Sequence, residues 1–79
     1  MQYNKDKVDE MVLALLYLTS SHDQYGTRSW KGLDVGILDR LCEKGYLIDP
    51  RGKSPTVLLT ETGEKLSKEL FFKYFDAIE

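Results

Sequence analysis

One stretch constrains the fold more than any other, and it reads LDVGILDRLCEKGYLIDPRGKSPTVLLTETG from residue 33 to residue 63. Apolar residues recur at helical spacing as far as Lys44, and Gly45 follows at the place of a left-handed helix cap. Residues 46–48 and 56–59 are short apolar runs, separated by a segment that holds both prolines of the chain. The stretch therefore predicts a helix, a stop and a β-hairpin.

Two further helices flank this stretch. From Asn4 to Ser20 the apolar residues predict one buried stripe, which comprises Val8, Met11, Val12, Leu15, Leu16 and Thr19. The apolar face is widened by Leu13, Ala14, Tyr17 and Leu18, so we expect burial on more than one side, inside the fold or against a partner chain. Thr60 is the expected N-cap of the last helix. The inner stripe of that helix comprises Leu66, Leu70, Phe71, Tyr74, Phe75 and Ile78. Phe72 falls outside this stripe.

Polar and turn-forming residues dominate between residues 20 and 32, with Gly26 and Gly32 among them. We expect a loop here, with at most a short turn of helix at residues 27–31. Trp30 is expected to anchor this loop against the core.

The predicted fold is α+β, with three main helices and a two-stranded hairpin in a single domain over residues 1–79. A chain of 79 residues with 42% hydrophobic and 30% charged residues has the composition of a small folded domain. Its formal net charge of -2 gives no global attraction to nucleic acid or to an anionic membrane.

The residues LDRLCEKGYLID and VLLTETGEKLSKELF resemble the closing half of bacterial winged-helix regulators of the multiple-antibiotic-resistance and phenolic-acid-decarboxylase types. This resemblance implies a small winged helix in which residues 33–44 form the recognition helix. Arg51 and Lys53 would lie at the tip of the hairpin, the wing. The whole chain, including DKVDEMVLALLYLTS and the WKG motif, also resembles a family of small uncharacterised bacterial proteins.

Basic residues gather in the middle of the chain, which suggests a contact with double-stranded DNA. The candidate nucleic-acid-binding residues are Arg28, Lys31, Arg40, Lys44, Arg51 and Lys53. The predicted recognition helix also carries the carboxylates of Asp34, Asp39 and Glu43, which repel phosphates. These charges are equally compatible with an ordinary solvated surface.

The aromatic residues Phe71, Phe72 and Phe75, with Tyr74 among them, exceed what one edge of so small a core needs. Core packing, a homodimer interface and a docking site for another protein all remain open. The resemblance implies dimerisation through the terminal helices. The alternative function is therefore a protein-interaction module that has lost DNA reading, such as an inhibitor encoded by a phage or a mobile element.

Catalytic and metal-binding patterns are not found in the sequence. His22 has no nucleophile or carboxylate motif around it, and Cys42 lies within an apolar helical pattern. We expect no enzymatic activity, no cofactor and no metal. A single cysteine suits a reduced cytoplasm, and residues 11–18, the longest apolar run, are too short to cross a membrane.

Overall fold

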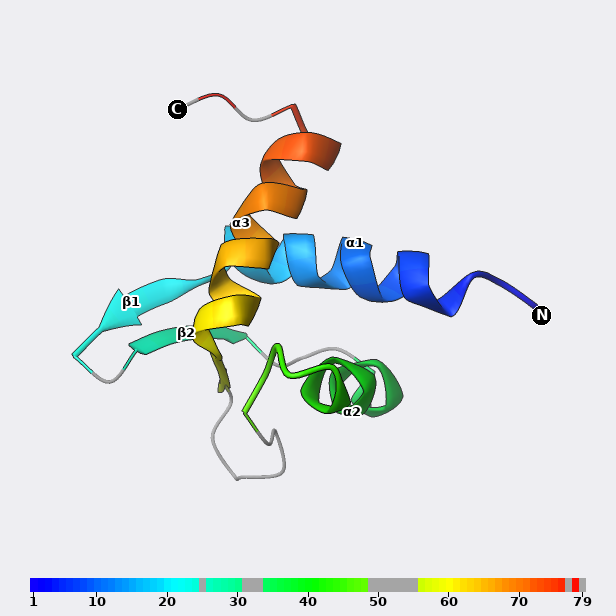
Figure 1. The fold of residues 1–79 in the computed structure, drawn as a ribbon, viewed down its shortest axis with the longest axis horizontal. Helices are drawn as coiled ribbons and strands as arrows, with labels where there is room; N and C mark the ends of the chain where they lie inside the picture. The colour runs from blue at the N-terminus through cyan, green and yellow to red at the C-terminus, as the bar shows by residue number, and fades with distance from the viewer. Residues whose placement is uncertain (25, 31–33, 49–55, 77, 79) are drawn as a thin grey trace.

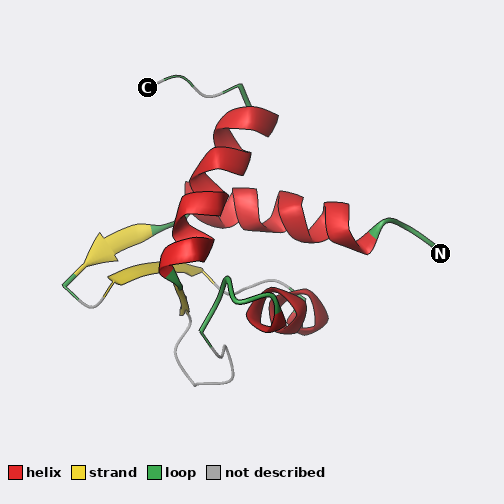
Figure 2. Ribbon diagram, in the orientation of Figure 1, coloured by secondary structure: helices red, strands yellow, loops and turns green. Residues whose placement is uncertain are grey.

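The computed structural model describes residues 1–24, 26–30, 34–48, 56–76 and 78 of the chain. Within them it contains three helices and one antiparallel sheet with the strand order β1-β2-β3 (Figures 1 and 2). The elements in chain order are α1 (Lys5–Leu18), β1 (Ser21–Asp23), β2 (Gly26–Trp30), α2 (Val35–Glu43), β3 (Thr56–Leu59) and α3 (Glu61–Tyr74). The α+β class and the three predicted helices are confirmed.

Helix α1 begins where the sequence predicts, because the Asn4 side chain accepts a hydrogen bond of 3.0 Å from the Lys7 backbone N–H. Its buried side differs from the predicted stripe. Leu13 and Ala14 are fully buried, whereas Met11 and Leu15 are exposed. The reason is tertiary: α1 packs against α3 as well as against α2 and β2, so the buried sector of the helix is wider and rotated.

A β-hairpin, β1–β2, replaces the loop and the turn of helix predicted for residues 20–32. Thr27 and Ser29 point inward on β2 and are buried, so the alternation typical of a strand is carried by polar residues. Ser29 Oγ donates to the Leu16 carbonyl oxygen at 2.7 Å, and Thr27 Oγ1 lies 2.8 Å from His22 Nδ1. These hydrogen bonds offset the free-energy cost of removing the two hydroxyl groups from water. The predicted anchoring role of the Trp30 side chain lies outside the described part of the chain.

Helix α2 starts after its cap at Asp34 and ends at the turn predicted for Gly45. Asp34 accepts a hydrogen bond of 3.2 Å from the Ile37 backbone N–H, and Gly45 adopts φ +84° just after the helix. Thr60 caps α3 and also ties it to this turn, because its hydroxyl accepts from Gly63 N–H at 2.9 Å and donates to the Gly45 carbonyl at 2.6 Å. The end of α2 and the start of α3 are therefore held together directly.

The predicted two-stranded hairpin is incomplete in the described residues. Strand β3 pairs along its length with β2, and Leu47 adds one isolated bridge to Leu59. Ile48 N–H donates to the Leu58 carbonyl at 2.9 Å. Residues 49–55, which include the predicted wing tip, lie outside the described part. The sheet thus gains β1 and β2, which the sequence did not predict, because their pairing depends on partners far along the chain.

The core lies where the three helices and the sheet meet. Its buried apolar residues are Val12, Leu13, Ala14, Leu16, Leu38, Leu41, Leu47, Val57, Leu59 and Leu70. In Figure 1, α3 crosses α1, and the last turns of α3 extend above α1. Helix α2 and the sheet lie below α1 in the same view. This arrangement leaves one long side of α1 uncovered.

Candidate functional site

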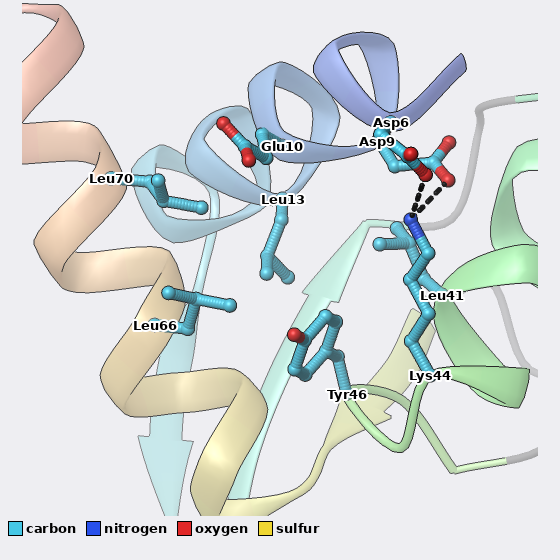
Figure 3. A pocket seen from close by; sticks show the side chains of 9 residues that line it. All are labelled: Asp6, Asp9, Glu10, Leu13, Leu41, Lys44, Tyr46, Leu66 and Leu70. Atoms are coloured by element: carbon cyan, nitrogen blue, oxygen red, sulfur yellow. Dashed lines mark hydrogen bonds and ion pairs between the residues drawn. The ribbon is translucent and has the colours of Figure 1, made fainter.

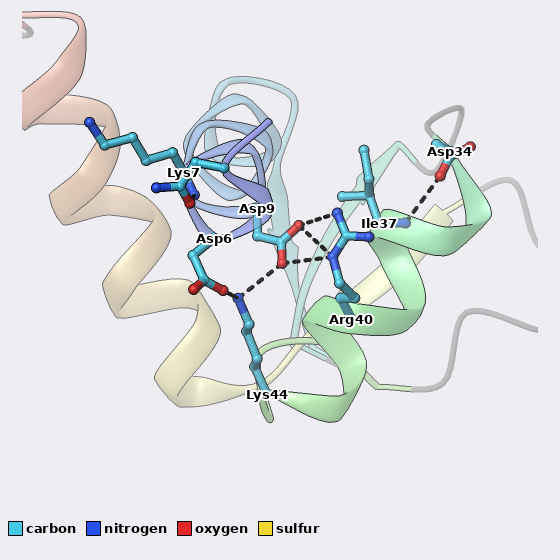
Figure 4. A network of polar contacts seen from close by, with 8 residues as sticks. Asp6, Lys7, Asp9, Asp34, Ile37, Arg40 and Lys44 are labelled. Carbon is cyan, nitrogen blue, oxygen red and sulfur yellow. Dashed lines mark hydrogen bonds and ion pairs between the residues drawn. The ribbon is translucent and has the colours of Figure 1, made fainter. Parts of the chain in front are cut away.

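An ion-pair network joins α1 to α2 (Figure 4). The Asp9 side chain is 2% exposed, and its carboxylate accepts from Arg40 Nε at 3.0 Å and from Arg40 Nη2 at 2.8 Å. Lys44 Nζ donates to the same carboxylate at 2.9 Å and to exposed Asp6 at 3.0 Å. Both carboxylate oxygens of Asp9 are therefore hydrogen-bonded, by Arg40 of α2 and by Lys44 at the C-cap of α2.

The network shifts the pKa values of its members in the directions expected for close ion pairs. The hydrogen bond from Arg40 holds the pKa of Asp9 below its usual value, against the opposing effect of burial, and Lys44 adds to the lowering. The hydrogen bonds to Asp9 raise the pKa values of Arg40 and Lys44. All three groups are held in their charged forms at neutral pH.

This network determines which charges α2 presents to solvent. Arg40 and Lys44 are paired with the Asp9 carboxylate on α1 and are partly exposed. The carboxylates of Asp34, Asp39 and Glu43 belong to exposed residues. The candidate DNA-reading helix thus shows solvent a mainly acidic face. Contact of Arg40 and Lys44 with DNA stays a prediction; in this structure both side chains are paired with Asp9.

Of the other candidate nucleic-acid residues, the structure describes Arg28. Arg28 lies half-buried on β2, opposite Leu58 of β3. Lys31, Arg51 and Lys53 lie outside the described residues. No common basic surface can be assigned from the described part of the chain.

The predicted interface residues do come together on α3. Phe71 stacks at a tilt on Tyr17, with ring centroids 5.3 Å apart, and on Phe75 at 5.2 Å. Phe72 meets Tyr17 edge-on at 6.1 Å. We call Tyr17, Phe71, Phe72 and Phe75 the aromatic cluster; Phe75 is 42% exposed, and Phe71 and Phe72 are half-buried.

A second apolar surface lies on α1, on a side of the helix that the sequence did not predict to be exposed. Met11, Leu15 and Leu18 lie one helical turn apart on α1 and are 37%, 43% and 65% exposed. We call them the outer stripe. Leu18 lines the same surface hollow as Tyr17 and Phe71, so the outer stripe continues into the aromatic cluster. The spacing was visible in the sequence, but the sequence could not show that this side of α1 faces solvent.

On another side of α1, a cavity of about 330 Å³ opens between α1, α3 and the turn after α2 (Figure 3). Its apolar lining comprises Leu13, Leu41, Leu66, Leu70 and Tyr46. Its polar lining comprises Asp6, Asp9, Glu10 and Lys44. Glu10 Oε2 accepts a hydrogen bond of 2.6 Å from the Tyr74 hydroxyl, and this bond raises the pKa of Tyr74.

His22 lies on strand β1, not in a loop. Its Nδ1 is 2.8 Å from Thr27 Oγ1 and 3.9 Å from Glu64 Oε1, and the side chain is 71% exposed. Cys42 is a half-buried free thiol. In the described ranges, no three His, Cys, Asp or Glu side chains are grouped so that they could hold a metal ion. Nor does the described part contain a helix with the length and apolarity needed to span a membrane.

The fold and these surfaces define a small α+β protein, and comparison with known proteins gives its family. The chain belongs to a family described as a domain of unknown function (DUF6429), whose model matches residues 4–77. It is similar to the "Uncharacterized protein y4hR" of Sinorhizobium fredii (strain NBRC 101917 / NGR234), with 43% identity over 75 residues, 95% of this chain and 97% of the relative. The expected membership of a small bacterial family is thus confirmed.

No solved structure matches the chain. Neither match names a transcriptional regulator, so the regulator resemblance stays a hypothesis. The function has to be argued from the surfaces described above.

Proposed function

We propose that this protein is a small protein-interaction module and that its first partner is a second copy of itself. The interaction surface is the outer stripe of α1 together with the aromatic cluster, which we call the α1–α3 face. The observation that carries the proposal is the exposure of Met11, Leu15 and Leu18 beside the rings of α3. A continuous exposed apolar patch on two adjacent helices is typical of an interface.

The charges around this face suit a second copy. A twofold interface brings the same surface together twice, so it has to be complementary to itself. The outer stripe is uncharged. At the edge of the aromatic cluster, Glu64 lines the hollow beside Phe71, and Lys68 Nζ lies 5.9 Å from the centre of the Phe72 ring. These opposite charges can pair across a twofold axis, whereas a rim of one sign would repel its copy.

Sedimentation velocity over a range of protein concentrations tests the proposal. We expect the wild-type chain to form a dimer, and Leu18→Glu to shift it to the monomer because a buried carboxylate without a partner is costly. Val35→Glu is the matched control, since Val35 is 68% exposed on α2 and lies outside the face. A monomeric wild type at the highest concentration, or equal effects of the two variants, would refute the proposal.

DNA binding by a winged helix is the second candidate function. It is supported by the order of elements from α2 onward, in which a helix, an isolated bridge, a strand and a helix follow one another after the β1–β2 hairpin. In this alternative Arg28, Lys31, Arg51 and Lys53 hold phosphates, and Arg40 with Lys44 approaches the groove. The acidic outer face of α2 makes it the weaker candidate.

Selection from a random duplex library, followed by binding measurements at several salt concentrations, separates the two functions. Enrichment of one sequence with affinity that falls steeply with salt is the result expected of a regulator. Lack of binding at low salt would eliminate DNA reading and leave the interaction module.

A further inference from the structure

We propose that the cavity between α1 and α3 binds a small organic amine with an apolar body. The apolar body would lie against Leu13, Leu66 and Tyr46, and the ammonium group at the carboxylate of Glu10. This site lies apart from the α1–α3 face, and its occupation does not depend on dimerisation.

The base of the cavity is made of side chains that other contacts already hold in place. Leu13 and Leu41 are each 1% exposed, and Leu70 is 7% exposed. Leu66 and Tyr46 are half-buried beside them and complete an apolar wall (Figure 3). A pre-formed apolar wall with a few convergent polar groups is the usual form of a small-molecule site.

The size of the cavity fits a small ligand. Its volume of about 330 Å³ is at the lower end of the range of roughly 300–1,000 Å³ found for ligand pockets. That space suits one ring or a short alkyl chain with a polar end.

The charged residues that line the cavity favour a ligand with a positive charge. The polar lining contains three carboxylates, those of Asp6, Asp9 and Glu10, and one lysine, Lys44. Asp9 is saturated by Arg40 and Lys44, and Lys44 is shared between Asp6 and Asp9. In the described part of the chain, the hydrogen bond to Glu10 comes from a neutral group, the Tyr74 hydroxyl.

Glu10 is therefore a half-buried carboxylate whose charge a ligand cation can balance. An anionic ligand would be repelled by the same rim. The apolar wall selects the body of the ligand, and the carboxylate of Glu10 selects its charge.

The test is a titration of the full chain, followed by the backbone amide signals in two-dimensional NMR. The probes are 2-phenylethylamine, the neutral 2-phenylethanol with the same ring, and ethylamine, which has the charge without the ring. We expect saturable shifts at Glu10, Leu13, Tyr46 and Leu66 with 2-phenylethylamine. The alcohol should bind roughly three- to tenfold more weakly, because it lacks the charge-assisted hydrogen bond.

Two variants separate the carboxylate from its surroundings. Glu10→Gln keeps an acceptor for Tyr74 and should lower amine affinity to that of the alcohol. Tyr74→Phe removes the hydroxyl and keeps the carboxylate, so amine binding should persist. Glu43→Gln, an exposed carboxylate of α2 away from the cavity, is the matched control.

Equal binding of amine and alcohol, unchanged amine affinity in Glu10→Gln, or shifts that do not saturate at these four residues would each overturn the proposal. A dimer that binds no amine would overturn this inference alone, and a monomer that binds amine would overturn the proposed self-association alone.

Discussion

Arg40 donates two hydrogen bonds to the carboxylate of Asp9, 31 residues earlier in the chain, through Nε at 3.0 Å and Nη2 at 2.8 Å. Asp9 is buried in α1, so this contact fixes α2 against α1 at its polar edge. It also turns a cation of the candidate DNA-reading helix inward. The Asp9–Arg40 ion pair thus contributes to the stability of the fold and also affects which charges α2 can offer to DNA.

Asp9→Asn should destabilise the protein by about 2–4 kcal/mol, because it leaves Arg40 and Lys44 without their shared carboxylate. The figure is below the full range for buried pairs, since both cations are partly exposed. Urea denaturation measures the change. Asp6→Asn is the control, because Asp6 is 85% exposed and should cost less than about 0.5 kcal/mol. Similar losses in both variants would contradict a dominant role for Asp9.

The pH dependence of stability follows from the lowered pKa of Asp9. Below the unfolded pKa of about 3.9, the unfolded chain binds a proton at this carboxylate that the folded chain still excludes. The contribution of Asp9 is therefore complete above that pH and is lost as the pH falls through the lower, folded pKa. Urea denaturation between pH 7 and pH 2.5 should show a larger acid loss for wild type than for Asp9→Asn. Parallel curves would show that Asp9 does not cause the loss.

At the alkaline end, Lys44 acts with the opposite sign. Its folded pKa is raised by Asp9 and Asp6, so its contribution is present below the unfolded pKa of about 10.4 and is lost as the pH rises through the folded value. Lys44→Met should flatten the alkaline part of the stability curve measured by urea denaturation. A curve that keeps the wild-type slope would assign the alkaline loss to other groups.

Gly63→Ala should destabilise the fold by at least about 2 kcal/mol. A Cβ atom at Gly63 would lie 2.0 Å from the Tyr46 carbonyl oxygen and 2.7 Å from its carbon, both of them backbone atoms that cannot turn away. Thermal unfolding measures the loss. At Gly36 the nearest atom to an added Cβ is the side-chain oxygen of Asp34, at 3.0 Å, so Gly36→Ala should be close to neutral. Equal melting temperatures for the two variants would show that the approach of α3 to Tyr46 is wider than described.

Ser29→Ala should cost about 1–2 kcal/mol, because the buried hydroxyl bridges Thr19 Oγ1 at 2.6 Å and the Leu16 carbonyl at 2.7 Å. Urea denaturation measures the change. Ser21→Ala on exposed β1 serves as the control. A neutral Ser29→Ala would mean that β2 is held to α1 by apolar packing alone.

The residue pattern that suggested winged-helix regulators has a structural role at the junction between α2 and α3. Gly45 provides the left-handed turn, Thr60 binds that turn, and Gly63 lets α3 pass close to Tyr46. The shared pattern of residues is thus accounted for by the junction between α2 and α3. A role in folding does not by itself imply DNA binding.

The sequence by itself determined the local features: the three helices, the cap of α3 at Thr60 and the turn at Gly45. Each of these depends on residues within one turn of each other, so the pattern is complete in a short segment. Only the tertiary structure decided the strand β2, the exposure of Met11 and Leu15, and the inward pairing of Arg40. These depend on groups far along the chain: the Leu16 carbonyl that satisfies Ser29, the position of α3 on α1, and Asp9. A periodic pattern shows that a helix has an apolar side, but the neighbours of the helix determine which residues of that side are buried.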